Sequence, residues 1–409
     1  MPAYCNPGMA KRLLVVGMSI AALTASCGGA QVSGSPPPSA GVQPTSLALP
    51  SSAPAAEPTP TVAPTETVAR AISWSKPALV EKSHCLVGSA AIDDSGRAHV
   101  ASECSGSIDY SVANGDRWQT TRLPHPADRI DKAPQLAFEG NTMYLGFTRV
   151  KILDGGCGDN GLSDVGVNVR QRELPAGDWK SPQRIGSPTD GLVALRVVDS
   201  TIHLLVKDRS DNRLYYETFQ DGTLGRYRLP GAVGGASLRI GDDGRARIVY
   251  EGGQNLQYAV FDGSGFTHAG IPGSSLGWGP SLVLDPQNHA HAIWMRSYHD
   301  GGCAEPEPES WFGTYYGSNE TGTWTYRRLS SQTNGASLTL DTETGRIHVA
   351  LSGRLGIRYL TKLGSGPWRE TRITTKADWA PIIKLDQRTG KLLVVYNGSE
   401  GEISAVTGD

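Results

Sequence analysis

A short apolar run that ends at an acidic residue or a turn recurs seven times along this chain of 409 residues. The seven runs are Ser89–Asp93, Gln135–Glu139, Ala194–Val198, Ser237–Gly241, Ser281–Asp285, Ser337–Asp341 and Ile382–Asp386. Their last residues are separated by 46, 59, 43, 44, 56 and 45 positions. A period near 45 residues in a chain of short strands is typical of β-propeller blades. We therefore predict an all-β fold, a seven-bladed β-propeller.

Each repeat has the residue pattern expected of four successive strands. A turn and a second strand follow the apolar run, a third strand carries alternating aromatic residues, and a fourth opens near an aromatic residue such as Trp118 or Trp324. The last repeat ends after its third strand, at residues 402–406, whereas residues 72–80 resemble the fourth-strand segment 179–185. We predict that the N-terminal strand closes the ring by completing the last blade. Deletion of residues 72–82 should then destabilise the whole ring.

The first residues have the pattern of an export signal. Lys11 and Arg12 precede an apolar stretch over residues 13–23, which is too short to cross a bilayer, and small residues then lead to Cys27. This segment resembles a bacterial lipoprotein signal, which implies a signal peptide over residues 1–26 and diacylation of Cys27. Thr24 stands where that family prefers leucine, so secretion after cleavage at the same small residues is the alternative. Translation can start at Met1 or at Met9.

Residues 27–70 are rich in proline, serine, alanine and threonine. Such a segment has too little apolar surface to offset the entropy cost of ordering, so we expect a disordered linker between the anchor and the propeller at 71–409. The expected location is the outer side of the cell membrane, held by the lipid, with release as the alternative. A net charge of −2 without a basic run gives no sign of nucleic-acid binding.

Four cysteines fall within the predicted propeller. An even number in an exported domain indicates two disulfides, for which three pairings exist. Cys85 with Cys104 is the local pairing within blade one. Cys157 and Cys303 lie in matching Asp-Gly-Gly-Cys insertions of the two longest repeats, and a Cys157–Cys303 disulfide would form a strap across the loop face. Two free thiols on separate loops are the alternative.

The repeat resembles bacterial propellers of the sialidase-like group, which carry Asp-box (BNR) repeats. The resemblance lies in the Asp-x-x-Gly-Arg-x-His-Val hairpin at residues 93–100 and in the Gly-x-Trp turns, and it covers residues 72–409. The segment 318–324 is the nearest Asp-box, with Glu320 in place of the aspartate. Resemblance at this level implies the fold and leaves the function open.

Candidate ligand-binding residues lie on the face that bears the long loops, near the axis, where propellers usually bind. The set is Arg149, Arg296, Lys207, Glu251, Arg354, Tyr298, Trp278 and Trp379. Glu103, Asp208 and Trp311 lie on the same face. Arginine, carboxylate and indole groups together suit a carbohydrate or an anionic peptide. The alternative is that Trp278 and Trp379 fill gaps between blades and that the charges are solvated.

Metal binding is not expected. Acidic residues of the two insertions offer oxygen ligands for calcium, but no EF-hand spacing is present, so solvated acidic loops are the preferred interpretation and no cofactor is predicted. Four histidines occupy one repeat position on different blades, which indicates strand residues rather than a metal cluster. They are His99, His203, His291 and His348.

Two functions of different class fit these observations. The first is a surface-tethered, monomeric binding module whose loop face captures a glycan or an envelope or extracellular protein. The alternative is a sialidase-like glycoside hydrolase, which needs an arginine cluster and a tyrosine nucleophile. Arg149, Arg296, Arg354 and Tyr298 supply those residue types but not the order of that family, so no catalytic residue is assigned.

Overall fold

The computed structural model of the protein describes residues 72–409 apart from 83, 116, 153–161, 298–310, 333, 355, 376–379 and 399–400. The predicted signal peptide, Cys27, the linker, Tyr298, Trp379 and the Cys157–Cys303 pair lie outside the described residues. Within the described part of the chain, no helix has the length and hydropathy needed to cross a membrane.

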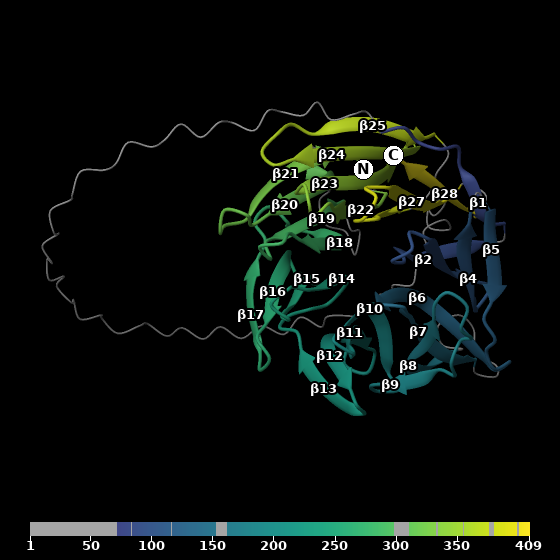
Figure 1. Ribbon diagram of the computed structural model, residues 1–409. Coiled ribbons are helices and arrows are strands. Elements are labelled where there is room, and N and C mark those ends of the chain that lie inside the picture. The colour runs from purple at the N-terminus through teal and green to yellow at the C-terminus, as the bar shows by residue number, and fades with distance from the viewer. Residues whose placement is uncertain are drawn as a thin grey trace, which may run out of the picture. The chain divides into compact units, whose positions relative to one another are not determined.

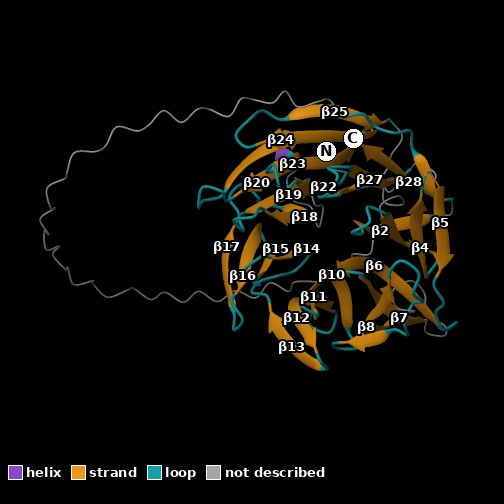
Figure 2. Ribbon diagram, in the orientation of Figure 1, coloured by secondary structure: helices purple, strands orange, loops and turns teal. Residues whose placement is uncertain are grey.

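Seven sheets of four antiparallel strands stand around one axis (Figure 1), which confirms the predicted seven-bladed propeller. Figure 2 shows the described domain almost wholly as strands and the loops that join them. In six sheets the strands follow chain order from the axis outward. First strands of neighbouring blades contact each other around the ring, from β2 (Cys85–Ile92) and β6 (Arg129–Glu139) to β22 (Ala336–Leu340) and β26 (Ile382–Leu385). Residues of the first strands therefore surround the axis.

The strand bounds are as follows. Blade one contains β2 (Cys85–Ile92), β3 (Ala98–Cys104), β4 (Ser107–Asn114) and β5 (Arg117–Arg122). Blade two contains β6 (Arg129–Glu139), β7 (Thr142–Ile152), β8 (Leu162–Glu173) and β9 (Gln183–Ile185). Blade three contains β10 (Asp190–Val198), β11 (Thr201–Asp208), β12 (Arg213–Gln220) and β13 (Thr223–Arg228). Blade four contains β14 (Ala236–Ile240), β15 (Ala246–Gly252), β16 (Asn255–Phe261) and β17 (Phe266–Gly270).

The remaining blades repeat this plan. Blade five contains β18 (Gly277–Leu284), β19 (Ala290–Arg296), β20 (Gly313–Ser318) and β21 (Thr325–Ser330). Blade six contains β22 (Ala336–Leu340), β23 (Arg346–Gly353), β24 (Gly356–Leu363) and β25 (Arg369–Thr374). Blade seven contains β26 (Ile382–Leu385), β27 (Leu392–Asn397), β28 (Ile403–Gly408) and β1 (Ala78–Glu81).

β1 comes from the N-terminal side of the domain and pairs with the last strand of the chain. It lies antiparallel to β28, with Ala78 opposite Ala405. Just before it, the ring of Trp74 packs edge-on against Tyr359 of blade six, with ring centroids 5.2 Å apart. The sheet of blade seven thus contains strands from both ends of the described domain.

The core lies between the blades. One apolar cluster joins Leu205 and Tyr216 of blade three to Leu238, Ile248 and Tyr250 of blade four, and further clusters lie at other blade contacts. The second strands are buried on both faces, which explains their continuous apolar runs. Burial of this kind makes neighbouring blades mutually dependent for stability.

Side-chain hydroxyls on the first strands add polar links between blades. Oγ of Ser89 accepts a hydrogen bond from the backbone N–H of Leu136 in the next blade at 3.1 Å. Ser237 does the same for Leu282 at 3.1 Å, and Ser337 for Ile383 at 2.8 Å. A serine within an apolar run therefore satisfies a backbone donor of the following blade.

The four repeat-position histidines lie on second strands and hydrogen-bond through Nδ1 to tyrosine hydroxyls of the third strands. The pairs are His99–Tyr110 and His348–Tyr359 at 2.6 Å, and His203–Tyr216 and His291–Tyr316 at 2.7 Å. Burial lowers the pKa of His203 and of His348 to about 4, so both are neutral at pH 7.

Candidate functional site

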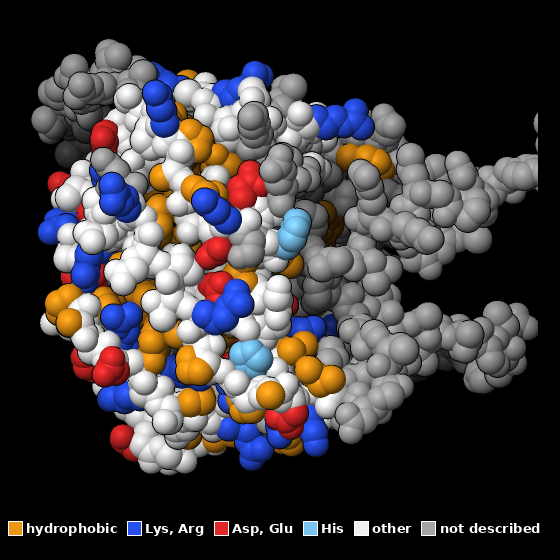
Figure 3. All heavy atoms as spheres, turned by 90° about the vertical axis from the view of Figure 1, so that its right-hand side faces the viewer, with side chains coloured by type: hydrophobic (Ala, Val, Ile, Leu, Met, Phe, Trp, Pro, Cys, Tyr) orange, Lys and Arg blue, Asp and Glu red, His pale blue; other side chains and the backbone are white. Residues whose placement is uncertain are grey.

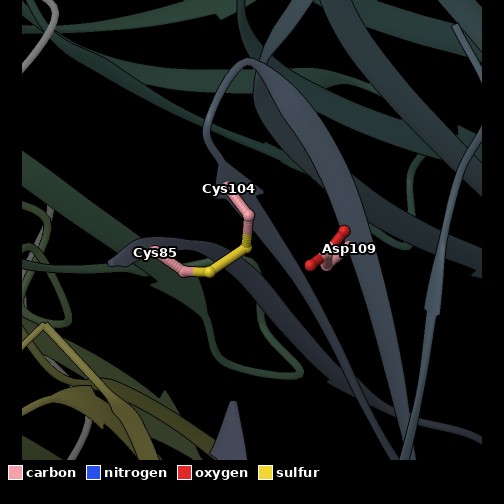
Figure 4. Close-up of side chains that lie close together, drawn as sticks. All are labelled: Cys85, Cys104 and Asp109. Carbon is pink, nitrogen blue, oxygen red and sulfur yellow. A yellow bond between two sulfur atoms is a disulfide. The ribbon is translucent and has the colours of Figure 1, made fainter. Parts of the chain in front are cut away.

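The ends of β2 and β3 are joined by a disulfide between Cys85 and Cys104 on the loop face, as predicted. Figure 4 shows this bond, with the carboxylate of Asp109 beside it. Asp109 accepts two hydrogen bonds from the guanidinium of Arg122 at 2.8 and 2.9 Å. The sulfur atoms and this carboxylate are therefore all committed to structural contacts.

A cavity of about 390 Å³ opens on the loop face of blade two. Its wall consists of Pro126, Asp128, Arg129, Arg149, Asn168 and Arg184. Three of these residues are arginines and one is acidic. The volume is in the range of small-molecule sites, and guanidinium groups match the planar geometry of carboxylate and phosphate oxygens.

The arginines of this cavity differ in how they are held. Arg149 is buried and makes a two-point ion pair with Asp131, Nε to Oδ1 at 2.7 Å and Nη2 to Oδ2 at 2.8 Å. Arg129 lies 3.3 Å from the carboxylate of Asp128. Arg184 is exposed, and no ion pair to it is found within the described residues. Arg184 is thus the guanidinium that is most accessible to a ligand.

A second set of cationic side chains, separate from the cavity of blade two, lies on the first strands at the axis. The seven runs place Ala91, Ala137, Arg196, Arg239, Val283, Thr339 and Lys384 at one position of the first strands. Burial lowers the pKa of Arg196 to about 10. Burial, and then the charge of Arg196, lowers the pKa of Lys384 to about 8. Blades three and seven are not neighbours, so this repulsion acts across the axis.

The polar contacts of these axial cations are with backbone. Nη1 of Arg239 donates to the carbonyl oxygen of Leu238 at 2.8 Å, and Nη1 of Arg196 donates to the carbonyl of Leu195. Among the described residues, no carboxylate contributes to the pKa of Arg196 or Lys384. These cations are half-buried, and partly desolvated positive charge without a counter-charge is costly, so the axis favours an anion.

The predicted aromatic and cationic residues of blade five do lie together. The guanidinium carbon of Arg296 is 5.0 Å from the ring centroid of Trp311 and 5.7 Å from that of Tyr315. Arg296 and Trp311 line a narrow recess of about 10 Å³. Nε1 of Trp278 donates to Oγ of Ser297 at 2.8 Å. The recess is too small for a sugar ring in this conformation.

Several other candidates link neighbouring blades. Nζ of Lys207 donates to the carbonyl oxygen of Val233 at 3.2 Å, and burial lowers the pKa of Lys207. Oε1 of Glu251 accepts from the N–H of Gly279 in blade five at 3.1 Å. Oε2 of Glu103 accepts from the N–H of Ala133 in blade two at 3.2 Å. These residues at the ends of second strands have a structural contact that any ligand would have to displace.

Asp208 belongs to a charge cluster within blade three. Arg226 contacts the carboxylates of Asp190 at 2.9 Å, of Asp208 at 2.8 Å and of Glu217. Burial, and then the charge of Asp190, raises the pKa of Glu217 to about 7. Tyr215 lies under the guanidinium, 3.9 Å from ring centroid to carbon. The cluster is largely buried and forms part of the blade.

The predicted arginines do not share one contact network. Arg149 belongs to the cavity of blade two and Arg296 to the recess of blade five, while Arg354 is exposed on blade six, where its N–H donates to Oε1 of Gln332. Sequence reasoning missed Arg129, Arg184 and the axial cations. The alignment of the first-strand runs contains the signal for the axial set, because Arg196, Arg239 and Lys384 occupy one repeat position.

The view in Figure 3 shows basic and acidic side chains interspersed over one side of the ring, without a large patch of one sign. The net charge of −2 agrees with that distribution. Local groups such as the arginine cavity therefore stand out against a balanced surface.

Comparisons with known proteins support the fold. No protein-family model matches the chain, and no curated protein matches it. Among solved structures, virginiamycin B lyase from Staphylococcus aureus with quinupristin matches with a TM-score of 0.55 at 14% identity, over 82% of this chain and 99% of that one. An α-L-arabinanase of Penicillium chrysogenum complexed with arabinobiose matches with a TM-score of 0.51 at 11% identity, over 82% and 98%.

Hydrazine synthase from Kuenenia stuttgartiensis also matches, with a TM-score of 0.55 at 11% identity, over 78% of this chain and 94% of that one. Lyases, glycoside hydrolases and a synthase therefore share this propeller architecture. Identities this low show a common fold and leave the chemistry to the residues of the site.

Proposed function

We propose that this protein is a cell-surface binding module that captures an anionic ligand, an acidic carbohydrate, on the loop face of its propeller. The observation that carries the proposal is the cavity of about 390 Å³ whose wall contains Arg129, Arg149 and Arg184. The ion pair with Asp131 holds the side chain of Arg149 in place, so a ligand meets a preorganised guanidinium rather than a mobile side chain.

The residues around the cavity suit a carboxylate-bearing sugar. Arg184 is exposed and offers a two-point contact to a carboxylate. Asn168 offers an amide, and Pro126 and the side-chain stems of the arginines supply apolar surface. The solved arabinanase was obtained with arabinobiose, so a propeller of this class can hold a saccharide.

The proposed setting is the outer surface of the cell membrane, with a lipid on Cys27 and the linker 27–70 as a spacer. At about 3.1 Å per residue in an extended polyproline-like form, the linker would hold the propeller up to ~130 Å from the bilayer. A glycan of the envelope, or an envelope or extracellular protein that carries acidic groups, is the expected partner.

The test is calorimetric titration of the full chain with acidic and neutral oligosaccharides of equal length, such as oligogalacturonate and arabino-oligosaccharide. We expect binding of the acidic oligomer alone, weakened at least about tenfold in Arg184→Gln, since a charge-assisted contact contributes roughly 1.5–3 kcal/mol. The matched control is Arg327→Gln, which removes an exposed arginine from β21 of blade five.

Equal affinity for the neutral oligomer, or equal affinity in Arg184→Gln, would contradict the proposal. Added salt should weaken binding, because the contacts are ionic. Release of shortened sugar during the titration would replace the binding module with the glycoside hydrolase alternative. Arg149→Gln is a poor test, since it leaves Asp131 buried without its partner.

A further inference from the structure

Three metal-ligating side chains converge at the hairpin-turn end of blade five, opposite the loop face. Asp285 follows β18, His291 lies on β19, and Glu320 lies in the turn from β20 to β21. Nε2 of His291 is 3.5 Å from Oε1 of Glu320 and 3.7 Å from Oδ2 of Asp285. The three ligating atoms all lie within 4.8 Å of one another.

These separations suit one metal ion. Zinc bonds of 2.0–2.2 Å to nitrogen and oxygen at tetrahedral angles place ligand atoms about 3.4 Å apart. The two measured separations from His291 are therefore close to what a shared ion requires. They are also too long for good hydrogen bonds between the imidazole and the carboxylates.

The nitrogen at the centre of this group has no hydrogen-bond partner within the described residues. His291 is 1% exposed, and its Nε2 is buried and unpartnered. The other ring nitrogen, Nδ1, lies 2.7 Å from the hydroxyl of Tyr316, a contact that fixes the ring and aims Nε2 at the carboxylates. Metal-ligating histidines are usually oriented by a hydrogen bond of this kind at the second nitrogen.

In blade one, the histidine at the same repeat position has a hydrogen-bond partner. There Nε2 of His99 lies 3.0 Å from Oδ2 of Asp93, a hydrogen bond that satisfies the nitrogen. Arg97 also donates to that carboxylate oxygen at 3.0 Å. In blade five His289 stands at the position of Arg97, so an imidazole replaces a guanidinium. Nδ1 of His289 lies 2.8 Å from Oδ2 of Asp285.

Blade six gives a second comparison. Nε2 of His348 is also buried without a partner. Oδ2 of Asp341, the equivalent of Asp285, accepts the hydroxyl of Thr344 at 2.6 Å. Among the described residues, no second carboxylate completes a metal-ligating group there, whereas Glu320 does so in blade five. Glu320 is also the residue that departs from the Asp-box pattern.

We propose that Asp285, His291 and Glu320 bind a zinc ion that ties the β18–β19 turn to the β20–β21 turn of blade five. One imidazole and two carboxylates form a nitrogen–oxygen set that zinc accepts, and the fourth position is open to water. Glu320 is 43% exposed, so an ion can enter from solvent. The proposal is independent of the proposed anion site, because it uses the opposite end of the blades.

The test is titration of the full chain, first treated with EDTA, with ZnCl₂ by calorimetry and with Co²⁺ by visible absorption. We expect one high-affinity ion per chain and a Co²⁺ d–d band typical of nitrogen and oxygen ligands. Glu320→Gln should weaken zinc binding at least tenfold and abolish the rise in Tm that zinc gives the wild type. The matched control Glu343→Gln removes an exposed carboxylate from the equivalent turn face of blade six and should bind as the wild type does.

A second variant guards against a folding artefact. His291→Gln keeps a polar group of similar size but cannot ligate well, and it should lose the Co²⁺ band while Tm in EDTA reports on its fold. Absence of stoichiometric binding, or equal affinity in Glu320→Gln and the wild type, would overturn the proposal. Loss of binding in Glu343→Gln as great as in Glu320→Gln would overturn it too, since the ion would then lie elsewhere.

Discussion

Blade three contains two arginines that meet opposite electrostatic surroundings. Arg226 on β13 contacts three carboxylates, those of Asp190, Asp208 and Glu217. Arg196 on β10 faces the axis, where its charge lowers the pKa of a second cation, Lys384. The first arginine neutralises charge that the fold itself has buried. The second leaves positive charge uncompensated, and such charge is available to a ligand. Residue type alone therefore does not mark a binding arginine in this ring.

The largest expected change in stability comes from removing Arg226 from its cluster of three carboxylates. Arg226→Gln leaves two fully buried carboxylates, Asp190 and Glu217, without their cation. We expect a loss of about 3–5 kcal/mol in the free energy of unfolding, measured by urea denaturation at pH 7.5. Arg327→Gln on β21 is the control and should change stability by less than about 0.5 kcal/mol. A loss below about 1 kcal/mol for Arg226→Gln would show that the cluster is not tightly coupled.

The next effect is a pH dependence within the same cluster. The pKa of Glu217 is about 7 in the folded protein, above its ordinary value of 4.5, chiefly because of burial. A raised carboxyl pKa contributes stability below pH 4.5 that is lost as the pH rises through 7. The wild type should therefore lose about 3 kcal/mol relative to Glu217→Gln between pH 4.5 and 8. Parallel stability curves of the two proteins over this range would contradict this assignment.

A substitution that removes positive charge at the axis should increase the free energy of unfolding rather than lower it. Lys384→Met removes a half-buried ammonium that repels Arg196, so we expect a gain of about 1 kcal/mol in stability at pH 7. Inorganic phosphate should raise the Tm of the wild type more than that of the variant, because the axial charge falls. Lys391→Met, at an exposed position of blade seven, is the control. An equal response of all three proteins to phosphate would show that the axis does not bind the anion.

The smallest effect concerns an ion pair at the rim. Arg122 is 56% exposed and pairs with the buried carboxylate of Asp109. Arg122→Gln should cost about 0.5–1 kcal/mol at low salt and less at 1 M salt, since solvent screens the exposed partner. If Arg122→Gln lost as much stability as Arg226→Gln, and lost it equally at all salt concentrations, the exposed ion pair would be energetically like the buried cluster and the distinction would fail.

Sequence periodicity predicted the blades because the apolar runs of first strands must be buried, and this constraint repeats seven times. Cys85 and Cys104 were paired correctly because their loops belong to one blade, so proximity followed from the repeat. The ion pair of Arg149 with Asp131 was not predicted, since Asp131 lies before the run that defines the repeat. The cavity was missed for a similar reason, because Arg129 and Arg184 come from the ends of β6 and β9, where the repeat is least regular.

The pairing of β1 with β28 has a mechanical consequence. β1 has four residues and an irregular register between Leu79 and Glu81, and it is the first strand of the described chain. A pull from residues before 72 would meet the backbone hydrogen bonds of Ser73 and Ser75 to Asp409 and Thr407 and then β1. Under such a load the ring should open first between β1 and β28, and because neighbouring blades depend on one another for stability, loss of this pairing should weaken the rest of the ring.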